Sequence, residues 1–250
     1  MLVLAAGMGS RLSPAARGIP KPLVRLGGRS LLEWNLAWLS AAGAREVWIN
    51  LHHGADRVRG ELGEELFGMA IHYSPEAVLL GTAGGWRRVV ELEGGRAARW
   101  LVLYGDNLMR FDLHSFQSAH ARVAAADPRA TAGPARLATV ALFDPAVHPN
   151  TGIAGGRAVL DEVGAITAFR EGEPAAGGYV NAGAYVLESQ VLAAVPQGPA
   201  DFGRDVLPVL AGEGKLMGHV MERGGFCLGV DTPERLRIAE SMLAAGEVAP

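Results

Sequence analysis

Cysteine, long apolar runs and clustered positive charge are all scarce in this sequence. The single cysteine, Cys227, excludes an internal disulfide and fits a reducing compartment. No apolar run approaches the roughly 20 residues of a transmembrane helix, and no basic segment precedes the short apolar run at the N-terminus, so a secretory signal is not expected. The formal net charge of −3 gives no footprint of a nucleic-acid-binding protein. We therefore expect a soluble, cytoplasmic protein that binds neither a membrane nor a nucleic acid.

Apolar strands alternate with helices in the first half of the chain. The 250 residues are 49% hydrophobic and 20% charged, which is ordinary for a globular protein and enough for a full core. Ser30 and Glu33 form a capping box before one helix, and Thr82 is expected to cap another. The expected strands cover 2–6, 46–51, 69–73 and 100–104, and the expected helices 31–42, 56–66, 83–93 and 112–126. This alternation predicts an α/β fold with a Rossmann-like, mostly parallel sheet sandwiched by helices.

The pattern changes after residue 136, where a smaller α+β lobe is expected to be inserted. Its expected elements are a strand over 137–143, a hairpin over 157–169, a strand over 179–187 and a helix over 202–211. A strand over 226–230 should then return the chain to the sheet, before a last helix that Thr232 caps. We therefore expect a single domain, 1–250, made of three parts: 1–136, 137–225 and 226–250.

The first strand ends in a glycine-rich turn that carries positive charge. Gly7 and Gly9 follow the apolar run, and glycines in such a turn let backbone amides approach an anion. Arg11 and Lys21, the latter between two prolines, add two fixed positive charges. The dinucleotide fingerprint G-x-G-x-x-G fails, because its third small position is Leu12. The opening stretch therefore suits a polyphosphate and argues against a nicotinamide-dependent oxidoreductase.

Two aspartates end apolar runs that lie far apart in the sequence. Asp106 follows the strand over 100–104 in a Gly-Asp-Asn turn, and Asp231 precedes the last helix. Taken alone, each is equally consistent with a plain turn or helix-entry residue. Ligands of parallel sheets bind outside the carboxyl ends of the strands, where a second glycine-rich turn, 79–85, should also lie. A metal ion that neutralises two phosphate groups needs carboxylates at that edge, and the two aspartates are the candidates.

The opening stretch closely resembles the signature of the sugar-phosphate nucleotidylyltransferases, and later segments match that family in the right order along nearly the whole chain. The segments 50–53 and 81–85 are most similar to the mannose- or heptose-1-phosphate guanylyltransferase and N-acetylmuramate-1-phosphate uridylyltransferase branches. The resemblance implies a GT-A-like nucleotidyltransferase fold. It also implies an enzyme that transfers a nucleoside monophosphate from a nucleoside triphosphate to a sugar 1-phosphate, releases pyrophosphate and uses Mg²⁺.

The resemblance also implies roles for the residues that match the family's motifs. Arg11 and Lys21 would neutralise the triphosphate, and Asp106 would take part in catalysis. Asp106 and Asp231 would hold Mg²⁺. The implied nucleotide-binding residues are Leu4, Ala5, Ala6, Gly7, Gly9, Ser10, Gly81, Thr82 and Ala83. The implied sugar-phosphate-binding residues are Gly152, Glu171 and Asn181.

Two departures from the family pattern put the acceptor in question. Relatives carry Phe-x-Glu-Lys-Pro, whose lysine contacts phosphate, whereas this chain has Phe-Arg-Glu-Gly-Glu-Pro over 169–174 and lacks that lysine. Arg170 is close in sequence, but an arginine is not a simple replacement for a lysine point charge. Ala16 also stands where relatives have threonine.

Two other functions therefore stay open. One is a catalytically silent nucleotide-sugar-binding regulatory protein. The other is a cytidylyltransferase that acts on a non-sugar phosphate such as choline phosphate. The base, the sugar and a homo-oligomeric state are also left open.

Overall fold

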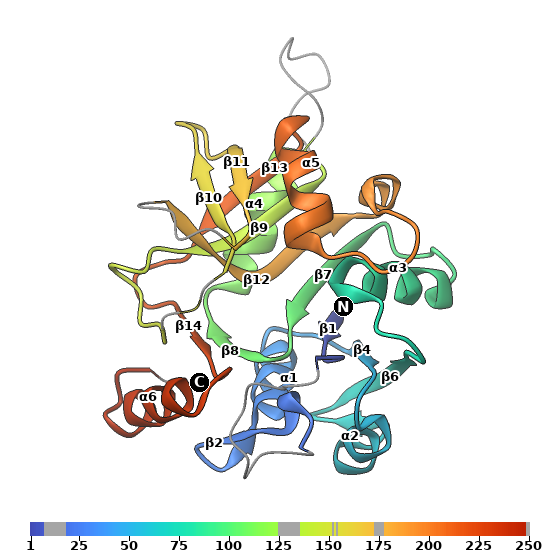
Figure 1. Ribbon diagram of the computed structural model, residues 1–250, viewed down its shortest axis with the longest axis vertical. Coiled ribbons are helices and arrows are strands. Elements are labelled where there is room, and N and C mark those ends of the chain that lie inside the picture. The colour runs from blue at the N-terminus through green and yellow to red at the C-terminus, as the bar shows by residue number, and fades with distance from the viewer. Residues whose placement is uncertain (8–18, 125–135, 152, 154, 173–177, 249–250) are drawn as a thin grey trace.

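A mixed sheet of ten strands runs through the molecule (Figure 1). The computed structural model describes residues 1–7, 19–124, 136–151, 153, 155–172 and 178–248. The strands of this sheet are β1 (Leu2–Leu4), β4 (Glu46–Leu51), β5 (Glu65–Leu66), β6 (Met69–Pro75), β7 (Arg99–Tyr104), β9 (Ala138–Phe143), β10 (Arg157–Leu160), β11 (Ile166–Arg170), β12 (Tyr179–Glu188) and β13 (Leu216–Val220). The order is β11-β10-β12-β7-β1-β4-β6-β5, and β9 pairs with both β12 and β13. Because β7, β1, β4 and β6 are parallel, their carboxyl ends share one edge.

The long strand β12 joins the two halves of this sheet. Its second half, residues 184–188, pairs antiparallel with β7, and its first two residues pair with β10. Its other side pairs with β9. The strands of the segment 137–225 therefore extend the same sheet beyond β7.

Helices cover both faces of the sheet. α1 (Leu31–Ala41), α2 (Ala55–Leu62) and α4 (Leu113–Ala124) share one hydrophobic core with the sheet, and α3 (Gly81–Glu93) and α5 (Leu207–Gly212) share the other. Successive side chains of a strand point to opposite faces, so Val47 and Ile49 of β4 lie in the first core while Trp48 packs against the second. The predicted α/β class, with a sheet between two layers of helices, is confirmed.

A separate two-stranded sheet carries the end of the chain to the strand edge. β14 (Phe226–Gly229) pairs antiparallel with β8 (Asn107–Arg110), with Gly229 opposite Asn107. The expected return of 226–230 to the main sheet is therefore wrong. Since antiparallel pairing puts the end of β14 beside the start of β8, the residues after β14 lie next to the turn before β8.

The last helix closes a small third core beside this sheet. α6 (Pro233–Ala244) begins after Thr232, whose hydroxyl accepts a hydrogen bond from the N–H of Arg235, as the predicted cap requires. Ala239 of α6 packs in this core with apolar residues of β14 and with Leu26 of β2 (Arg25–Leu26), which pairs with β3 (Arg29–Ser30). This packing anchors the start of α6 near the strand edge.

Two expected helix boundaries are wrong, and at the first of them a glycine ends the helix. The helix expected over 56–66 ends at Leu62, because Gly63 adopts a φ of +70° and the short strand β5 follows. Thr82 does not cap α3, since the helix already begins at Gly81. The predicted capping box at the start of α1 is confirmed.

The segment after β12 contains elements that the sequence did not predict as such. The helix expected over 202–211 begins as a single π-helical turn, η4 (Phe202–Val206), and only then becomes α5. The strand β13 follows α5 and was not expected. In the part of the chain that is described, no helix is both long and apolar enough to span a membrane.

Candidate active site

Lys21, Asp106 and Asp231 meet at the carboxyl edge of the central strands. The Nζ atom of Lys21 lies 2.7 Å from Oδ2 of Asp106 and 2.5 Å from Oδ1 of Asp231. Lys21 belongs to a one-turn 3₁₀ helix, η2 (Lys21–Leu23), and is 85 and 210 positions away from the two aspartates. The two aspartates that end distant apolar runs thus share one cation.

Local backbone geometry places each member of this cluster. Gly105 packs against β1, where a Cβ atom would lie 2.7 Å from Cγ1 of Val3, so a glycine is needed for the turn that presents the first aspartate. Lys21 has a proline on each side, which restricts the backbone around it. Nη1 of Arg235, in the first turn of α6, lies 3.3 Å from Oδ2 of Asp231 and orients that carboxylate.

The charges of this cluster stabilise one another. Burial alone would lower the pKa of Lys21, but the two carboxylates outweigh it and raise that pKa above its ordinary value. Lys21 is 4% exposed, whereas the side chains of Asp106 and Asp231 are 33% and 19% exposed. Lys21 is therefore a permanent buried cation, and the carboxylates that cover it remain accessible from solvent.

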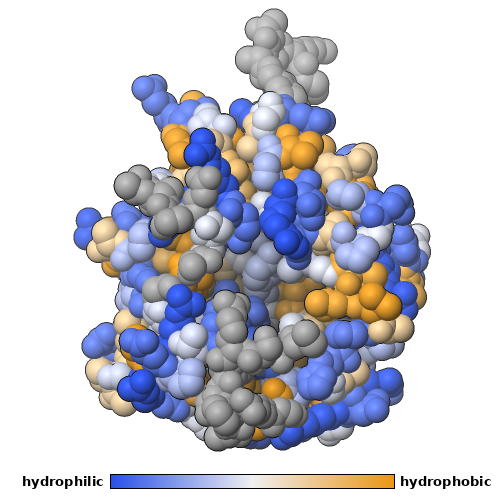
Figure 2. Space-filling view, in the orientation of Figure 1, coloured by the Kyte–Doolittle hydropathy of each residue, from blue (hydrophilic) through white to orange (hydrophobic). Residues whose placement is uncertain are grey.

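A cleft with a volume of about 180 Å³ opens beside the cluster, and Asp106 forms part of its wall. The surface is hollowed near the centre of the face shown in Figure 2. The residues in its wall that the sequence indicated as site residues are Leu4, Ala6, Gly7, Gly81, Thr82 and Asp106. Those that it did not indicate are Asn50, Leu79, Tyr104 and Asp201. The cleft thus lies at the carboxyl ends of β1, β4 and β7, where the parallel strands were expected to place it.

Six other predicted site residues either lie in a hydrophobic core or fall outside the described residues. Ala5 and Ala83 are 3% and 0% exposed and lie in the two hydrophobic cores. The four remaining ones lie outside the described residues; they are Gly9, Ser10, Arg11 and Gly152.

Asn50 and Glu76 connect the two glycine-rich segments that border the cleft. Oδ1 of Asn50 accepts from the N–H of Ala5 at 2.8 Å, and its Nδ2 donates to Oε1 of Glu76 at 2.8 Å. Oε2 of Glu76 accepts from the N–H of Leu80 at 3.0 Å. A Cβ atom at Gly85 would lie 2.6 Å from Nδ2 of Asn50, so this glycine makes room for the connection. The end of β1 and the start of α3 are therefore held in a fixed relation.

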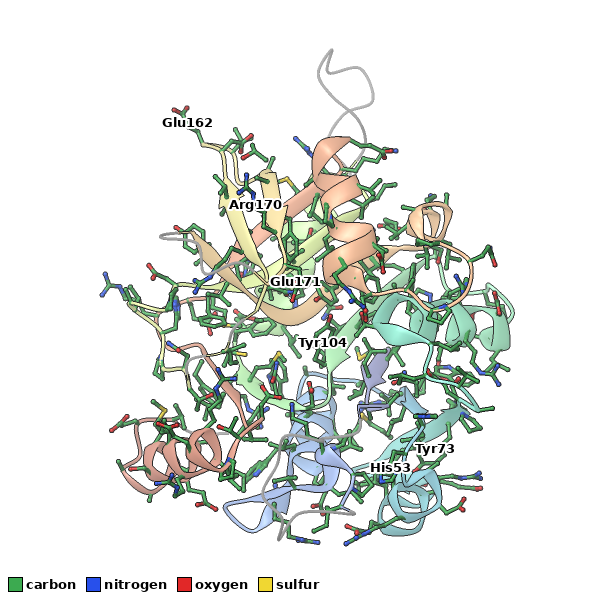
Figure 3. The ribbon with its side chains drawn as sticks, viewed as in Figure 1. His53, Tyr73, Tyr104, Glu162, Arg170 and Glu171 are labelled. Atoms are coloured by element: carbon green, nitrogen blue, oxygen red, sulfur yellow. The ribbon has the colours of Figure 1, made fainter. Side chains whose placement is uncertain are left out.

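Glu171 lies near Tyr104, which forms part of the cleft wall. Figure 3 shows both near the centre of the view, whereas Glu162 lies far away at the tip of the β10–β11 hairpin. Partial burial, and then the charge of Asp201, raise the pKa of Glu171. Burial raises the pKa of Tyr104 to about 12, so its hydroxyl stays protonated. The Tyr104 hydroxyl is already hydrogen-bonded to the side chains of Tyr185 and Thr82, so the group of this region that can hydrogen-bond to a sugar is the carboxylate of Glu171.

Asn181 lies beneath this region with its carboxamide already engaged. Its Nδ2 donates to the hydroxyl of Tyr185 at 2.8 Å, and its Oδ1 accepts from the N–H of Gly183 at 2.9 Å. The side chain is 7% exposed. Asn181 thus shapes β12 where the strand passes from β10 to β7, and its contact with a sugar stays a prediction.

Comparison with known proteins decides the family. The family model described as nucleotidyl transferase matches residues 1–227. The chain belongs to the nucleotidyl transferase family. A similar curated protein, the UTP–glucose-1-phosphate uridylyltransferase of Synechocystis, is 28% identical over 227 residues, which are 85% of this chain and 55% of that protein. The N-acetylmuramate alpha-1-phosphate uridylyltransferase of Neisseria meningitidis is 39% identical over 121 residues, 47% of this chain and 52% of that protein.

Solved structures agree with this family at the level of the fold. The HddC protein of Yersinia pseudotuberculosis, in its complex with GMP-PN, superposes on this nucleotidyl transferase with a TM-score of 0.76. The match covers 97% of this chain and 98% of that one, at 20% identity. The chain spans only slightly more than half the length of the two curated relatives.

Sequence reasoning missed four side chains at the site of this nucleotidyl transferase, namely Asn50, Glu76, Tyr104 and Asp201. Tyr104 ends one predicted strand of the parallel sheet and Asn50 is the last residue but one of another, so the rule that pointed to Asp106 could also have pointed to them. Glu76 is 6% exposed, and a buried carboxylate is rare without partners. Asp201 gave no such signal, because its meeting with α3 depends on the fold.

Proposed function

We propose that this protein joins a nucleoside triphosphate to a sugar 1-phosphate and releases pyrophosphate. The observation that carries the proposal is the Lys21–Asp106–Asp231 cluster at the rim of the cleft. The two curated relatives are named as uridylyltransferases that act on a sugar 1-phosphate, which supports this substrate class. The base and the identity of the sugar are not part of the proposal.

The chemical difficulty of this reaction is the repulsion between two anions. An oxygen of the sugar 1-phosphate attacks the α-phosphorus, and the bond from that phosphorus to the bridging oxygen of pyrophosphate breaks. Catalysis of such a transfer consists mainly of positioning and of electrostatic stabilisation. A buried lysine supplies positive charge that is already in place before the substrates bind, and Lys21 has this property.

The end of β1 is open to a phosphate group. Gly7 is exposed, and a Cβ atom built on it would meet none of the described residues within 4 Å, so that among them nothing keeps a ligand from this backbone. We place the triphosphate here, beside Gly81 and Thr82 of the cleft wall. Arg11, which lies outside the described residues, would add a second positive charge to this end of the cleft.

The two aspartates fit a magnesium ion that arrives with the nucleotide. Among the described residues no three or more His, Cys, Asp or Glu side chains gather as a metal site. Mg²⁺ commonly uses only one or two carboxylates and takes its other ligands from phosphates and water, and a cation already stands between these two carboxylates in the form of Lys21. Bound to Asp106 and Asp231, the ion would neutralise phosphate charge and stabilise the leaving pyrophosphate.

The sugar is placed on the side of Glu171. Its carboxylate lies near Tyr104 at the centre of the molecule (Figure 3), so that a hydroxyl of the sugar can donate to it. Gly172 stands where relatives have the phosphate-binding lysine, and among the described residues Arg204 is the cation whose charge acts on Glu171.

Pyrophosphate release tests this function directly. The purified protein is assayed with Mg²⁺, each of the four nucleoside triphosphates and a panel of sugar 1-phosphates, and choline phosphate is included as a non-sugar acceptor. The proposal expects turnover with at least one sugar 1-phosphate. Turnover with choline phosphate alone would favour the cytidylyltransferase. No turnover, together with tight binding of a nucleotide sugar, would favour the catalytically silent regulatory protein. The absence of the phosphate-binding lysine is the feature of the sequence that favours this alternative.

A further inference from the structure

The π-helical turn η4 (Phe202–Val206) lies between the start of α3 and the side chain of Glu171. Oδ1 of Asp201, directly before the turn, accepts from the N–H of Thr82 at 3.1 Å. The N–H of Phe202 donates to the hydroxyl oxygen of Thr82 at 2.9 Å. The turn is therefore bonded to the first turn of α3, on the side where the nucleotide is placed. Short π-helical turns occur often at functional sites.

On its other side, the turn lies directly against Glu171. A Cβ atom at Gly203 would overlap Oε2 of Glu171 and lie 2.8 Å from its Cδ and 3.3 Å from its Cγ. These are the three nearest atoms to that position, and all belong to the one side chain. Gly156 borders the same carboxylate, since a Cβ atom there would also overlap Oε2. The carboxylate thus fits between two glycines, although much of the rest of the Glu171 side chain is exposed.

The conformation of Gly203 does not by itself require glycine. Its φ is not in the left-handed region, so other residues could adopt this backbone. The need for glycine arises from the space that the carboxylate of Glu171 occupies. A methyl group at 203 would force Glu171 to move, while the buried neighbours Phe202 and Val206 hold the turn in place.

We propose that Gly203 is a positioning residue for the sugar side of the site: by leaving room for the carboxylate of Glu171, it fixes the place where that carboxylate meets the acceptor. This inference rests on the proposed function, in which Glu171 binds the sugar. The bonds from Asp201 and Phe202 to Thr82 give the same turn a fixed position relative to the nucleotide. The turn therefore sets the distance between the two substrates.

A double-mutant cycle between Gly203→Ala and Glu171→Ala tests the proposal. With an active substrate pair, Gly203→Ala should raise the KM for the sugar 1-phosphate by about tenfold to a hundredfold, as expected when a charged hydrogen bond is lost. The KM for the nucleoside triphosphate should stay within about twofold. In the Glu171→Ala background, Gly203→Ala should have no further effect, because the atoms that it would displace are gone.

Gly212→Ala is the matched control. Gly212 ends α5, the helix that follows the turn, and a Cβ atom there would meet nothing within 4 Å. This variant should leave both KM values unchanged. The melting temperature of every variant is measured alongside, and Gly203→Ala should gain stability when combined with Glu171→Ala.

The proposal is overturned if Gly203→Ala behaves like the control or raises both KM values alike. It is also overturned if Gly203→Ala raises the KM for the sugar 1-phosphate as much in the Glu171→Ala background as in the wild type. If the wild-type protein turns over no substrate pair, the proposed function fails. The same double-mutant cycle is then measured as binding affinity: calorimetric titrations compare UDP-glucose with UDP and GDP-mannose with GDP, and each difference gives the contribution of the sugar. Loss of the affinity contributed by the sugar in Gly203→Ala, without further loss in the double variant, then supports the positioning role. An unchanged sugar contribution, or none in the wild type, contradicts it.

Discussion

Lys21 is a lysine that water scarcely reaches, held by two carboxylates from distant parts of the chain. Such a group has two consequences at once. It cancels the repulsion between Asp106 and Asp231, and it keeps a positive charge fixed at the rim of the cleft. Stability and catalysis should therefore both respond to its removal, and they can be measured separately.

Lys21→Met should destabilise the fold by about 1–3 kcal/mol. Removing one partner of a fully buried ion pair costs about 3–5 kcal/mol, but the two carboxylates here are 33% and 19% exposed, so water compensates for part of the loss. Added Mg²⁺ should raise the melting temperature of this variant more than that of the wild type, because the ion replaces the lost charge. Lys215→Met, at an exposed pair with Glu213, is the control and should change stability by less than about 0.5 kcal/mol. Equal effects of the two substitutions would contradict the role of the cluster.

Glu171→Gln should stabilise the protein at neutral pH while it weakens acceptor binding. The folded state raises the pKa of Glu171, so ionising this carboxyl costs stability above that raised pKa. Below the ordinary value of 4.5 the group is protonated in both states and the cost disappears. Denaturation curves at several pH values should give the variant a higher free energy of unfolding than the wild type near pH 7–8 and an equal one near pH 4. A variant that is less stable than the wild type at pH 8 would show that ionising Glu171 does not cost stability.

At the residue scale, the sequence indicated Lys21, Asp106 and Asp231 but not the residues that support the rest of the site. Asp106 and Asp231 could be selected because they end apolar runs and because the family has aspartates there. Asp201 and Gly203 could not, since each matters only through a side chain that lies far away in sequence and close in the fold. Glycine in particular gives no sign of which neighbour it makes room for.

Among the elements, α3 shows most clearly how close packing positions the cleft wall. Its first residue, Gly81, has a φ of +73°, and a Cβ atom there would lie 2.5 Å from the carbonyl oxygen of Ala200. The same carbonyl accepts from the N–H groups of Ala83 and Gly84. The glycines of this segment therefore hold the helix start against the chain before η4.

Gly81→Ala should lower the free energy of unfolding by at least about 2 kcal/mol, because it combines overpacking with a backbone conformation unfavourable to alanine. It should also raise the KM for the nucleoside triphosphate, since Gly81 lines the cleft. Gly60→Ala, inside α2 with nothing within 4 Å, is the control and should stabilise by about 0.5–1 kcal/mol. Chemical denaturation of the two variants separates the outcomes, and a neutral Gly81→Ala would refute the packing argument.

Element types followed from the sequence better than their ends or partners. The strand over 46–51 and the capping box at Ser30 were predicted as found, because each depends on local pattern. The partner of β14 was not, because the choice between the main sheet and β8 is made by tertiary contacts such as those of α6. The π-helical turn before α5 also lacks a local signal.

For the whole molecule, the decisive feature is that one sheet carries both of the proposed substrate sites. β12 pairs with β7 of the segment 1–136 and with β9 and β10 of the segment 137–225. Convergence of strand ends at one edge could be inferred from the α/β alternation. The way β12 joins the two halves of the sheet could not, since its pairing partners lie as much as 89 residues earlier in the chain.

Because of this shared sheet, we expect heat to unfold residues 1–250 in one cooperative transition. Differential scanning calorimetry should give a van't Hoff enthalpy close to the calorimetric enthalpy. Two resolved transitions would mean that the segment 137–225 folds as a unit of its own. Glu171→Ala, which leaves the sheet intact, should shift the transition without splitting it.

The central claim is that Asp106 and Asp231, brought together from distant segments, act as one catalytic unit. Turnover of the best substrate pair is measured at saturating Mg²⁺ for Asp106→Ala, Asp231→Ala and the double variant, with folding checked by circular dichroism. Each single change should lower kcat/KM by at least about a thousandfold, and the double change should be little worse, because groups that act as a unit are not additive. A folded Asp231→Ala or Asp106→Ala variant that keeps wild-type turnover would contradict the account.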